Sequence, residues 1–252
     1  MIYLKLLRLK DWAKNLFLFV PLFFAGEIFN YVKLLRVSEG FIAFCCIASS
    51  IYIINDYADK EEDKKHPLKR NRPIASGAIS TGAALSILAI LIATGFFIAY
   101  FINIKFFIIL GIYFLLNIGY SLGLKNIAIL DIFIIAIGFP LRVRAGGNIA
   151  NVDVTVWLNI MIFLLALFMA AGKRRDDVLL KISSGENMRK AIKGYTLDFL
   201  NALLALISSV MIVSYFMYTV SQSVMERHNT SRLYLTSLFV MAGIMRYLQI
   251  IY

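Results

Sequence analysis

Residues 74–104 read IASGAISTGAALSILAILIATGFFIAYFINI and contain no Asp, Glu, Lys or Arg. A helix that crosses the hydrocarbon core of a membrane needs about 20 apolar residues, so this run is long enough. Three more runs lack these four residue types, and four weaker apolar stretches accompany them: 106–124, 154–172 and 199–225, then 12–31, 40–55, 127–147 and 233–252. None alternates with a period of two, as the strands of a membrane barrel do. The expected fold is therefore all-α, a polytopic membrane bundle of about eight helices.

The basic residues gather on one expected side of the membrane. The formal net charge is +11, and 18 of the 26 Lys and Arg residues fall in four segments, 1–14, 56–73, Lys125 and 173–193. These segments share one side if the N-terminus is cytoplasmic, which is the positive-inside pattern of membrane proteins. The charge therefore predicts membrane orientation and does not indicate nucleic-acid binding. We expect a multi-pass protein of the cell (inner or plasma) membrane whose N-terminus and two long loops are cytoplasmic.

The first long loop opens with an acidic stretch, Asn-Asp-Tyr-Ala-Asp-Lys-Glu-Glu-Asp at 55–63. On a helix that turns by about 100° per residue, with Asn55 at zero, Asp56, Asp59 and Asp63 fall at about 100°, 40° and 80°. Carboxylates on one face repel one another unless a cation lies on them. Oxygen ligands suit Mg²⁺, which usually binds one or two carboxylates together with substrate phosphates. We predict that the three aspartates hold Mg²⁺; a solvated acidic helix end is the alternative.

Both long loops are rich in cations, at 64–73 and at 173–193. Arg and Lys bind phosphate oxygens, so the expected ligand is a polyanion such as a diphosphate, paired with the divalent metal. The metal would neutralise charge on a departing diphosphate. Because the site lies at a membrane, we expect one substrate to be a lipid. A transporter is disfavoured, since transporters place their ionisable residues near the bilayer midplane rather than at its edge.

Two charged groups in apolar runs have more than one interpretation. Asp131 lies inside an expected span, where carboxylates are usually functional or paired, and Lys125 is a candidate partner. Arg142 and Arg144 are interpreted as marking the outer end of the fifth helix.

The pattern Asn55-Asp56-x-x-Asp59-x-x-x-Asp63, after the second of about eight helices, resembles the first Asp-rich motif of the UbiA superfamily of membrane prenyltransferases. Further motifs, which cover nearly the whole chain, are similar to one branch, the decaprenyl-phosphate phosphoribosyltransferase-like branch: Arg8-x-x-Asp11-Trp12-x-Lys14-Asn15, His66-Pro-x-Lys69-Arg70-x-Arg72-Pro73-Ile74-Ala75-x-Gly77, Tyr120-Ser-x-x-x-Lys125, Gly138-Phe-x-x-Arg142-x-x-Ala-Gly and Gly172-Lys173-Arg174. The resemblance implies a single integral-membrane transferase domain over 1–252. Family members usually have nine helices, whereas about eight are expected here. The ninth, C-terminal helix of the family therefore has no counterpart among the expected spans.

The branch determines the implied reaction. Ordinary superfamily members move an isoprenoid from its diphosphate to an aromatic or other small polar acceptor, and they carry a second Asp-rich motif after the sixth helix. Here that position begins with the cations of Lys173-Arg174-Arg175, as in the phosphoribosyl branch. The resemblance implies transfer of the phosphoribosyl group from 5-phosphoribosyl 1-diphosphate to a decaprenyl-like polyprenyl phosphate, with Mg²⁺. Prenyl transfer of the ordinary kind remains the alternative, and the oligomeric state is not predicted.

The resemblance also implies residue roles. Asn55 would orient the diphosphate beside the metal ligands Asp56, Asp59 and Asp63, and these four form the catalytic group. The implied substrate-binding residues come from the first helix, both loops and the end of the fourth helix: Lys14, Asn15, Lys64, Lys69, Arg70, Arg72, Tyr120, Lys125, Lys173, Arg174 and Asp177. For any single Lys or Arg, the alternative is that the residue helps to set the membrane topology and contacts anionic lipids.

Overall fold

The computed structural model describes residues 2–65, 69–184, 192 and 194–252, and within these ranges the regular elements are all helices. The chain divides into two compact units. Unit 1 comprises Met1–Lys125 and Leu141–Val154, and unit 2 comprises Asn126–Pro140 and Thr155–Tyr252. The division falls inside helix α7 (Leu130–Ala150), at Pro140. Proline has no backbone N–H to donate within a helix, so it is a position where helical regularity is weakened.

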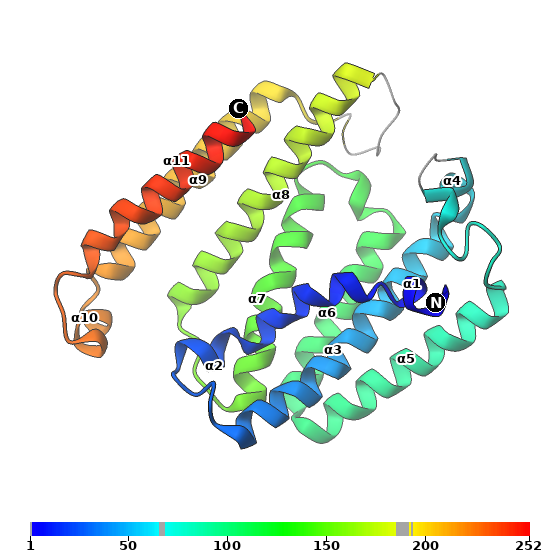
Figure 1. Cartoon of the computed structure of the whole chain (residues 1–252), viewed down its shortest axis with the longest axis horizontal. Helices are drawn as coiled ribbons and strands as arrows, with labels where there is room; N and C mark the ends of the chain where they lie inside the picture. Colours follow the sequence, from blue (N-terminus) through cyan, green and yellow to red (C-terminus); the bar gives the residue numbers. More distant parts are fainter. Residues whose placement is uncertain (1, 66–68, 185–191, 193) are drawn as a thin grey trace. The chain divides into compact units, whose positions relative to one another are not determined.

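Unit 1 is organised around α3 (Tyr31–Ala58) (Figure 1). α5 runs alongside α3, and α6 and the 3₁₀ helix η1 also pack against it. The remaining elements of the unit are short, apart from the later part of α7, which begins at Leu141. The bounds of the unit's other elements are α1 Ile2–Leu7, η1 Leu9–Phe19, α2 Val20–Phe24, α4 Lys60–Lys65, η2 Lys69–Asn71, α5 Thr81–Ile102 and α6 Ile104–Leu122. η3 (Leu124–Asn126) then leads out of the unit.

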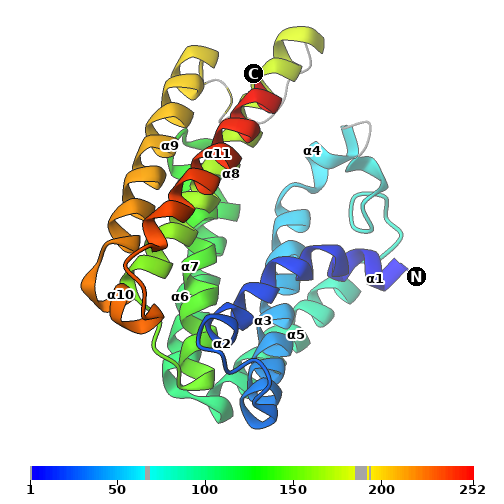
Figure 2. The same ribbon diagram turned by 60° about the vertical axis from the view of Figure 1, so that its left-hand side comes forward.

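Unit 2 contains the first part of α7 and a set of long helices, among which α9 packs against both α8 and α11 (Figure 2). The bounds are α8 Val156–Ser184, α9 Leu197–Thr219, α10 Gln222–His228, η5 Leu233–Thr236 and α11 Ser237–Ile251. Its core joins Ile132 and Ala136 of α7 with Leu167 and Phe168 of α8 and Leu204 of α9.

Seven helices of the described chain are long and apolar enough to cross a membrane, which confirms an all-α polytopic bundle. They correspond to seven of the eight expected spans. The expected first span at 12–31 is the exception, because this segment consists of η1 and the short α2 rather than one long helix. Pro21 lies in the first turn of α2, and Gly26 beyond its end has a positive φ of 73°, a conformation that terminates helices readily.

The acidic stretch 55–63 does not lie on one continuous helix. α3 ends at Ala58, Asp59 caps it outside helical geometry, and α4 begins at Lys60. α4 ends at Lys65, and His66 and Pro67, which follow it, lie outside the described residues. α5 begins at Thr81 after Ser80, whose hydroxyl accepts a hydrogen bond from the Ala83 N–H at 3.2 Å. This capping serine marks where the helix begins within the apolar run 74–104.

Candidate functional site

Two of the three predicted metal ligands converge on one guanidinium group. Nη1 of Arg72 lies 3.1 Å from Asp56 Oδ1 and 2.7 Å from Asp63 Oδ2. Asp56 also accepts a hydrogen bond from Arg8, at 2.5 Å, and the Arg8 guanidinium stacks over the Tyr52 ring. Both carboxylates are almost completely buried, whereas the two arginines remain partly exposed. A buried carboxylate requires this kind of charge compensation, because burial of an unpaired charge is strongly unfavourable.

The third predicted ligand, Asp59, has a different partner. Lys125 Nζ lies 2.6 and 2.8 Å from its two carboxylate oxygens, and 3.1 Å from Asn55 Oδ1. Lys125 comes from η3 and thus ties the end of α6 to the end of α3. Asn55 and Asp59 meet because they lie one helical turn apart, and the Asp59 N–H still donates to the Asn55 carbonyl. The helical-wheel prediction brought Asn55 close to Asp59, as found, but it missed the cation between them.

The donor set fits a magnesium ion in part. Asp56 and Asp63 supply oxygen atoms around one cationic nitrogen, and Mg²⁺ commonly takes one or two carboxylates plus phosphate oxygens. Within residues 2–65, 69–184, 192 and 194–252, however, no three His, Cys, Asp or Glu side chains are grouped closely enough to hold a metal together. Asp59 as a third direct ligand is therefore not gathered with the other two in this conformation, and its role as a metal ligand stays a prediction.

The other substrate-binding candidates of unit 1 differ in accessibility. Lys14 is exposed and pairs with Asp11 at 2.7 Å, and Lys64 pairs with Glu61 at 2.7 Å on the outside of α4. Arg70 is exposed, and Tyr120 is partly buried near the end of α6. Lys69 is partly buried at the start of η2, which packs against α4.

Asn15 and Arg142 form part of the unit 1 interior. Asn15 is fully buried; its amide donates to Cys45 Sγ, and its carbonyl accepts from Arg142 Nε at 2.9 Å. Arg142 also donates to the Tyr113 hydroxyl at 2.8 Å and is itself buried. Cys45 lies about 16 Å from Asp56 along the α3 axis, so Asn15 contacts a different part of the helix from the carboxylates. The interpretation of Arg142 as a mark of the outer end of the fifth helix is wrong, because it lies inside α7 and bonds inward to two other segments.

Unit 2 contains a second buried polar network. Asp131 accepts from Arg174 Nε at 2.6 Å and from the Tyr195 hydroxyl at 2.5 Å, and Arg174 Nη1 donates to Asp177 at 2.5 Å. Lys125 as the partner of Asp131 is thus wrong. Of the predicted substrate-binding residues here, Lys173 is exposed and makes no hydrogen bond or ion pair with the described chain, whereas Arg174 is buried between two aspartates.

Tyr195 completes this network from outside the membrane-capable helices, just before α9. Its hydroxyl accepts from the Ile129 N–H at 2.6 Å while it donates to Asp131. Burial, and then the hydrogen bond to Asp131, raise the pKa of the phenol well above its ordinary value. A raised pKa means that folding favours the protonated phenol. The contribution of Tyr195 to stability is therefore present below the unfolded pKa of about 10 and is lost as the pH rises above it.

Replacing Tyr195 with Phe removes the hydroxyl and leaves the Ile129 N–H and one Asp131 oxygen without that partner. We expect the variant to be destabilised by about 1–3 kcal/mol, the usual cost of unsatisfied buried polar groups. A thermal melt of purified protein in detergent at pH 7 measures this. Tyr234→Phe, at a more exposed tyrosine, is the control and should leave the melting temperature unchanged. Equal melting temperatures for Tyr195→Phe and wild type would show that the network contributes nothing.

The comparison with known families is decisive for the class of protein. A family model described as the UbiA prenyltransferase family matches residues 16–177, well over half of the chain. The chain belongs to the UbiA prenyltransferase family. It is accordingly a multi-pass membrane protein of the transferase class, with seven membrane-capable helices in its described part.

Relatives within this family carry a more specific name. The chain is 34% identical over 216 residues to a decaprenyl-phosphate phosphoribosyltransferase of Corynebacterium glutamicum, covering 84% of this chain and 65% of that one. It is 34% identical over 223 residues to the protein of the same name from Mycolicibacterium smegmatis, covering 87% of this chain and 70% of that one. The chain thus spans about two thirds of the length of these curated relatives.

Solved structures of UbiA proteins share the fold. A UbiA homolog from Archaeoglobus fulgidus, bound to GPP and Mg²⁺, superposes with a TM-score of 0.78 over 99% of this chain and 87% of that one, at 20% identity. At this identity the likeness concerns the fold alone, and it confirms the UbiA architecture.

Three polar residues central to the geometry were not predicted as site residues. Arg8 appears in the UbiA-like N-terminal motif, but nothing in the sequence connects it to Asp56, 48 positions away. Tyr195 and Arg142 likewise act over long sequence separations. The only available signal was Arg142 in an apolar run, where a charge needs a partner.

Proposed function

We propose that this protein transfers the phosphoribosyl group of 5-phosphoribosyl 1-diphosphate to a polyprenyl phosphate in a Mg²⁺-dependent reaction at the cytoplasmic face of the membrane. The observation that carries the proposal is the 34% identity, over most of the chain, to two proteins named decaprenyl-phosphate phosphoribosyltransferase. The pairing of the buried Asp56 and Asp63 with Arg8 and Arg72, and of the partly exposed Asp59 with Lys125, supports it, because a diphosphate with its metal needs both kinds of group.

The residues of unit 1 would bind the charged end of the donor. Mg²⁺ held by Asp56 and Asp63 would supply positive charge to the oxygens of the departing diphosphate. Arg72 offers a planar fork of donors suited to phosphate, and Lys125 offers a compact charge beside Asn55. The first long loop adds three more cations, which are Lys64 on α4 and Lys69 and Arg70 on η2. Together these groups stabilise negative charge as it develops on the leaving group, which is the main requirement of such a transfer.

The acceptor needs little activation. The phosphate of a polyprenyl phosphate is already an anion, so attack on C1 of the ribose requires no strong general base. Of the two predicted substrate-binding cations in unit 2, Lys173 is the accessible one, because Arg174 is bound to Asp131 and Asp177. We assign Arg174 and Asp177 to the support of this segment, and Lys173 to the substrate.

The deciding experiment uses purified protein, Mg²⁺, labelled 5-phosphoribosyl 1-diphosphate and a polyprenyl phosphate. We expect a labelled lipid that forms only when all components are present. Parallel reactions replace the donor with an isoprenoid diphosphate and the acceptor with a small aromatic acid. Product in that reaction alone would replace the phosphoribosyl assignment with ordinary prenyl transfer.

A further inference from the structure

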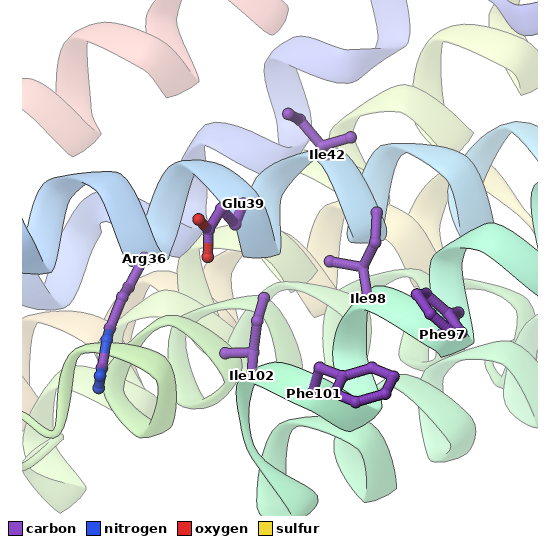
Figure 3. A pocket seen from close by; sticks show the side chains of 7 residues that line it. All are labelled: Arg36, Glu39, Ile42, Phe97, Ile98, Phe101 and Ile102. Carbon is purple, nitrogen blue, oxygen red and sulfur yellow. The ribbon is translucent and has the colours of Figure 1, made fainter.

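A groove of about 490 Å³ lies between α3 and α5, at the end of α3 opposite to the aspartates (Figure 3). The two helices approach closely at Gly95, where an added Cβ would lie 2.8 Å from Ile47 Cγ1 and 3.1 Å from the Ala43 carbonyl oxygen. The groove opens beyond this contact, near the last turns of α5. Its walls are formed by apolar side chains of both helices and by the charged Arg36 and Glu39 of α3.

The two charges in the groove have opposite signs and no partner in the described part of the chain. Arg36 and Glu39 are three residues apart, so they project from neighbouring positions on one face of α3. Neither side chain takes part in a hydrogen bond or an ion pair there. Both side chains are exposed and precede the apolar run 40–55, so we expect them at the level of the lipid headgroups rather than within the hydrocarbon core. A ligand that pairs with both must therefore carry an anion and a cation close together.

We propose that this groove binds a zwitterionic phospholipid with a primary-amine headgroup. The lipid phosphate meets the guanidinium of Arg36, and the ammonium donates hydrogen bonds to the carboxylate of Glu39. A choline headgroup has no N–H to donate, and a glycerol headgroup has no cation for Glu39. The headgroup chemistry therefore selects the amine lipid.

The apolar part of the groove accommodates an acyl chain without providing the selectivity. Ile42, Phe97 and Phe101 line it and are 54%, 66% and 71% exposed. Any lipid tail would cover these side chains, because bilayer lipids are as apolar as the groove itself. Discrimination between these lipids must therefore come from Glu39, while Arg36 holds the phosphate that they share, which makes the proposal testable by substitution of charge alone.

The test is native mass spectrometry of purified, delipidated protein titrated with phosphatidylethanolamine, phosphatidylcholine or phosphatidylglycerol of identical acyl chains. We expect the ethanolamine lipid to bind about tenfold more tightly than the other two, the size of one charge-assisted hydrogen bond. Glu39→Gln should abolish this preference, whereas Arg36→Gln should weaken the binding of all three lipids, because each of them carries the phosphate. Lys105→Gln, at an exposed lysine on the first turn of α6, removes one cation outside the groove and should preserve the preference.

Three results would overturn the proposal. Equal binding of the three lipids by the wild type would show that the protein binds lipid without recognising the headgroup. Preference for phosphatidylglycerol would show an anion site that uses Arg36 without Glu39. Retained preference in Glu39→Gln, with an unchanged melting temperature, would remove the carboxylate from the site. Transfer activity is not a readout of this experiment, so its outcome is independent of the proposed reaction.

Discussion

Replacing Asp56 with Asn is expected to reduce Mg²⁺-dependent transfer by roughly a hundredfold or more, because a neutral amide neither holds a divalent cation nor restrains two arginines as a carboxylate does. Asp56 is 2% exposed and accepts from both Arg8 and Arg72, so its charge is the centre of the cluster. The measurement is initial rate against Mg²⁺ concentration, with donor and acceptor saturating. Raising the Mg²⁺ concentration should recover little activity.

The matched control is Glu61→Gln, which removes a carboxylate from the same loop. Glu61 pairs with Lys64 on the exposed side of α4, and such surface pairs contribute about 0–1 kcal/mol to stability. We expect its rate to stay within about twofold of wild type, on the same reasoning. Thermal melts of both variants separate a loss of chemistry from a loss of folding. Near-normal activity of a folded Asp56→Asn protein would remove Asp56 from the metal site.

Replacing Arg72 with Gln is expected to change two binding constants in opposite directions. Nη1 of Arg72 lies between Asp56 Oδ1 and Asp63 Oδ2, so a metal ion held by both carboxylates competes with the guanidinium for the same oxygens. Removal of the guanidinium should strengthen metal binding by about tenfold, equivalent to about 1.4 kcal/mol. The donor should bind at least about tenfold more weakly, because its phosphates lose a bidentate cation. The first constant is measured by electron paramagnetic resonance of free Mn²⁺ without substrates, and the second as KM for the donor.

Arg70→Gln serves as the comparison for this prediction. Arg70 is an exposed residue of the same short helix η2, and it forms no hydrogen bond or ion pair with the described aspartates. Its Mn²⁺ affinity should equal that of the wild type. If Arg72→Gln instead weakens Mn²⁺ binding as strongly as Asp56→Asn does, the guanidinium holds the carboxylates in their binding geometry rather than competing with the metal.

The sequence predicted the membrane helices well because their signal is local. Uncharged runs such as 74–104 exclude any alternative to a spanning helix, and Ser80 marks the start of α5. The segment 12–31 shows the limit of such a signal, because the structure divides it into two short helical elements. Its composition is apolar, but Pro21 and Gly26 divide it, and average hydropathy does not register such breaks.

The site was only partly predictable, because its ion pairs join distant positions. The wheel argument identified Asp56, Asp59 and Asp63 from local spacing, and the cations were recognised as a class. It could not reveal that Arg72 forms ion pairs with Asp56 and Asp63, or that Lys125 forms one with Asp59. These pairings depend on the conformation of the loops between the residues. Asn15 bonds to Arg142 and Tyr195 bonds to Asp131, and each pair is brought together only by packing within its own unit. No rule of sequence spacing predicts such contacts.

The Asp131–Arg174 pair also has a consequence for the assembly of the protein during synthesis. Asp131 lies at the beginning of α7, and its partner is translated 43 residues later, in α8. A lone carboxylate within or beside a nascent membrane helix is costly, so α7 gains its charge compensation only when α8 has left the ribosome. Tyr195 follows later still, on the segment that leads into α9. The order of translation therefore sets an order of membrane insertion. We expect α7 to insert stably together with the helices that follow it rather than alone.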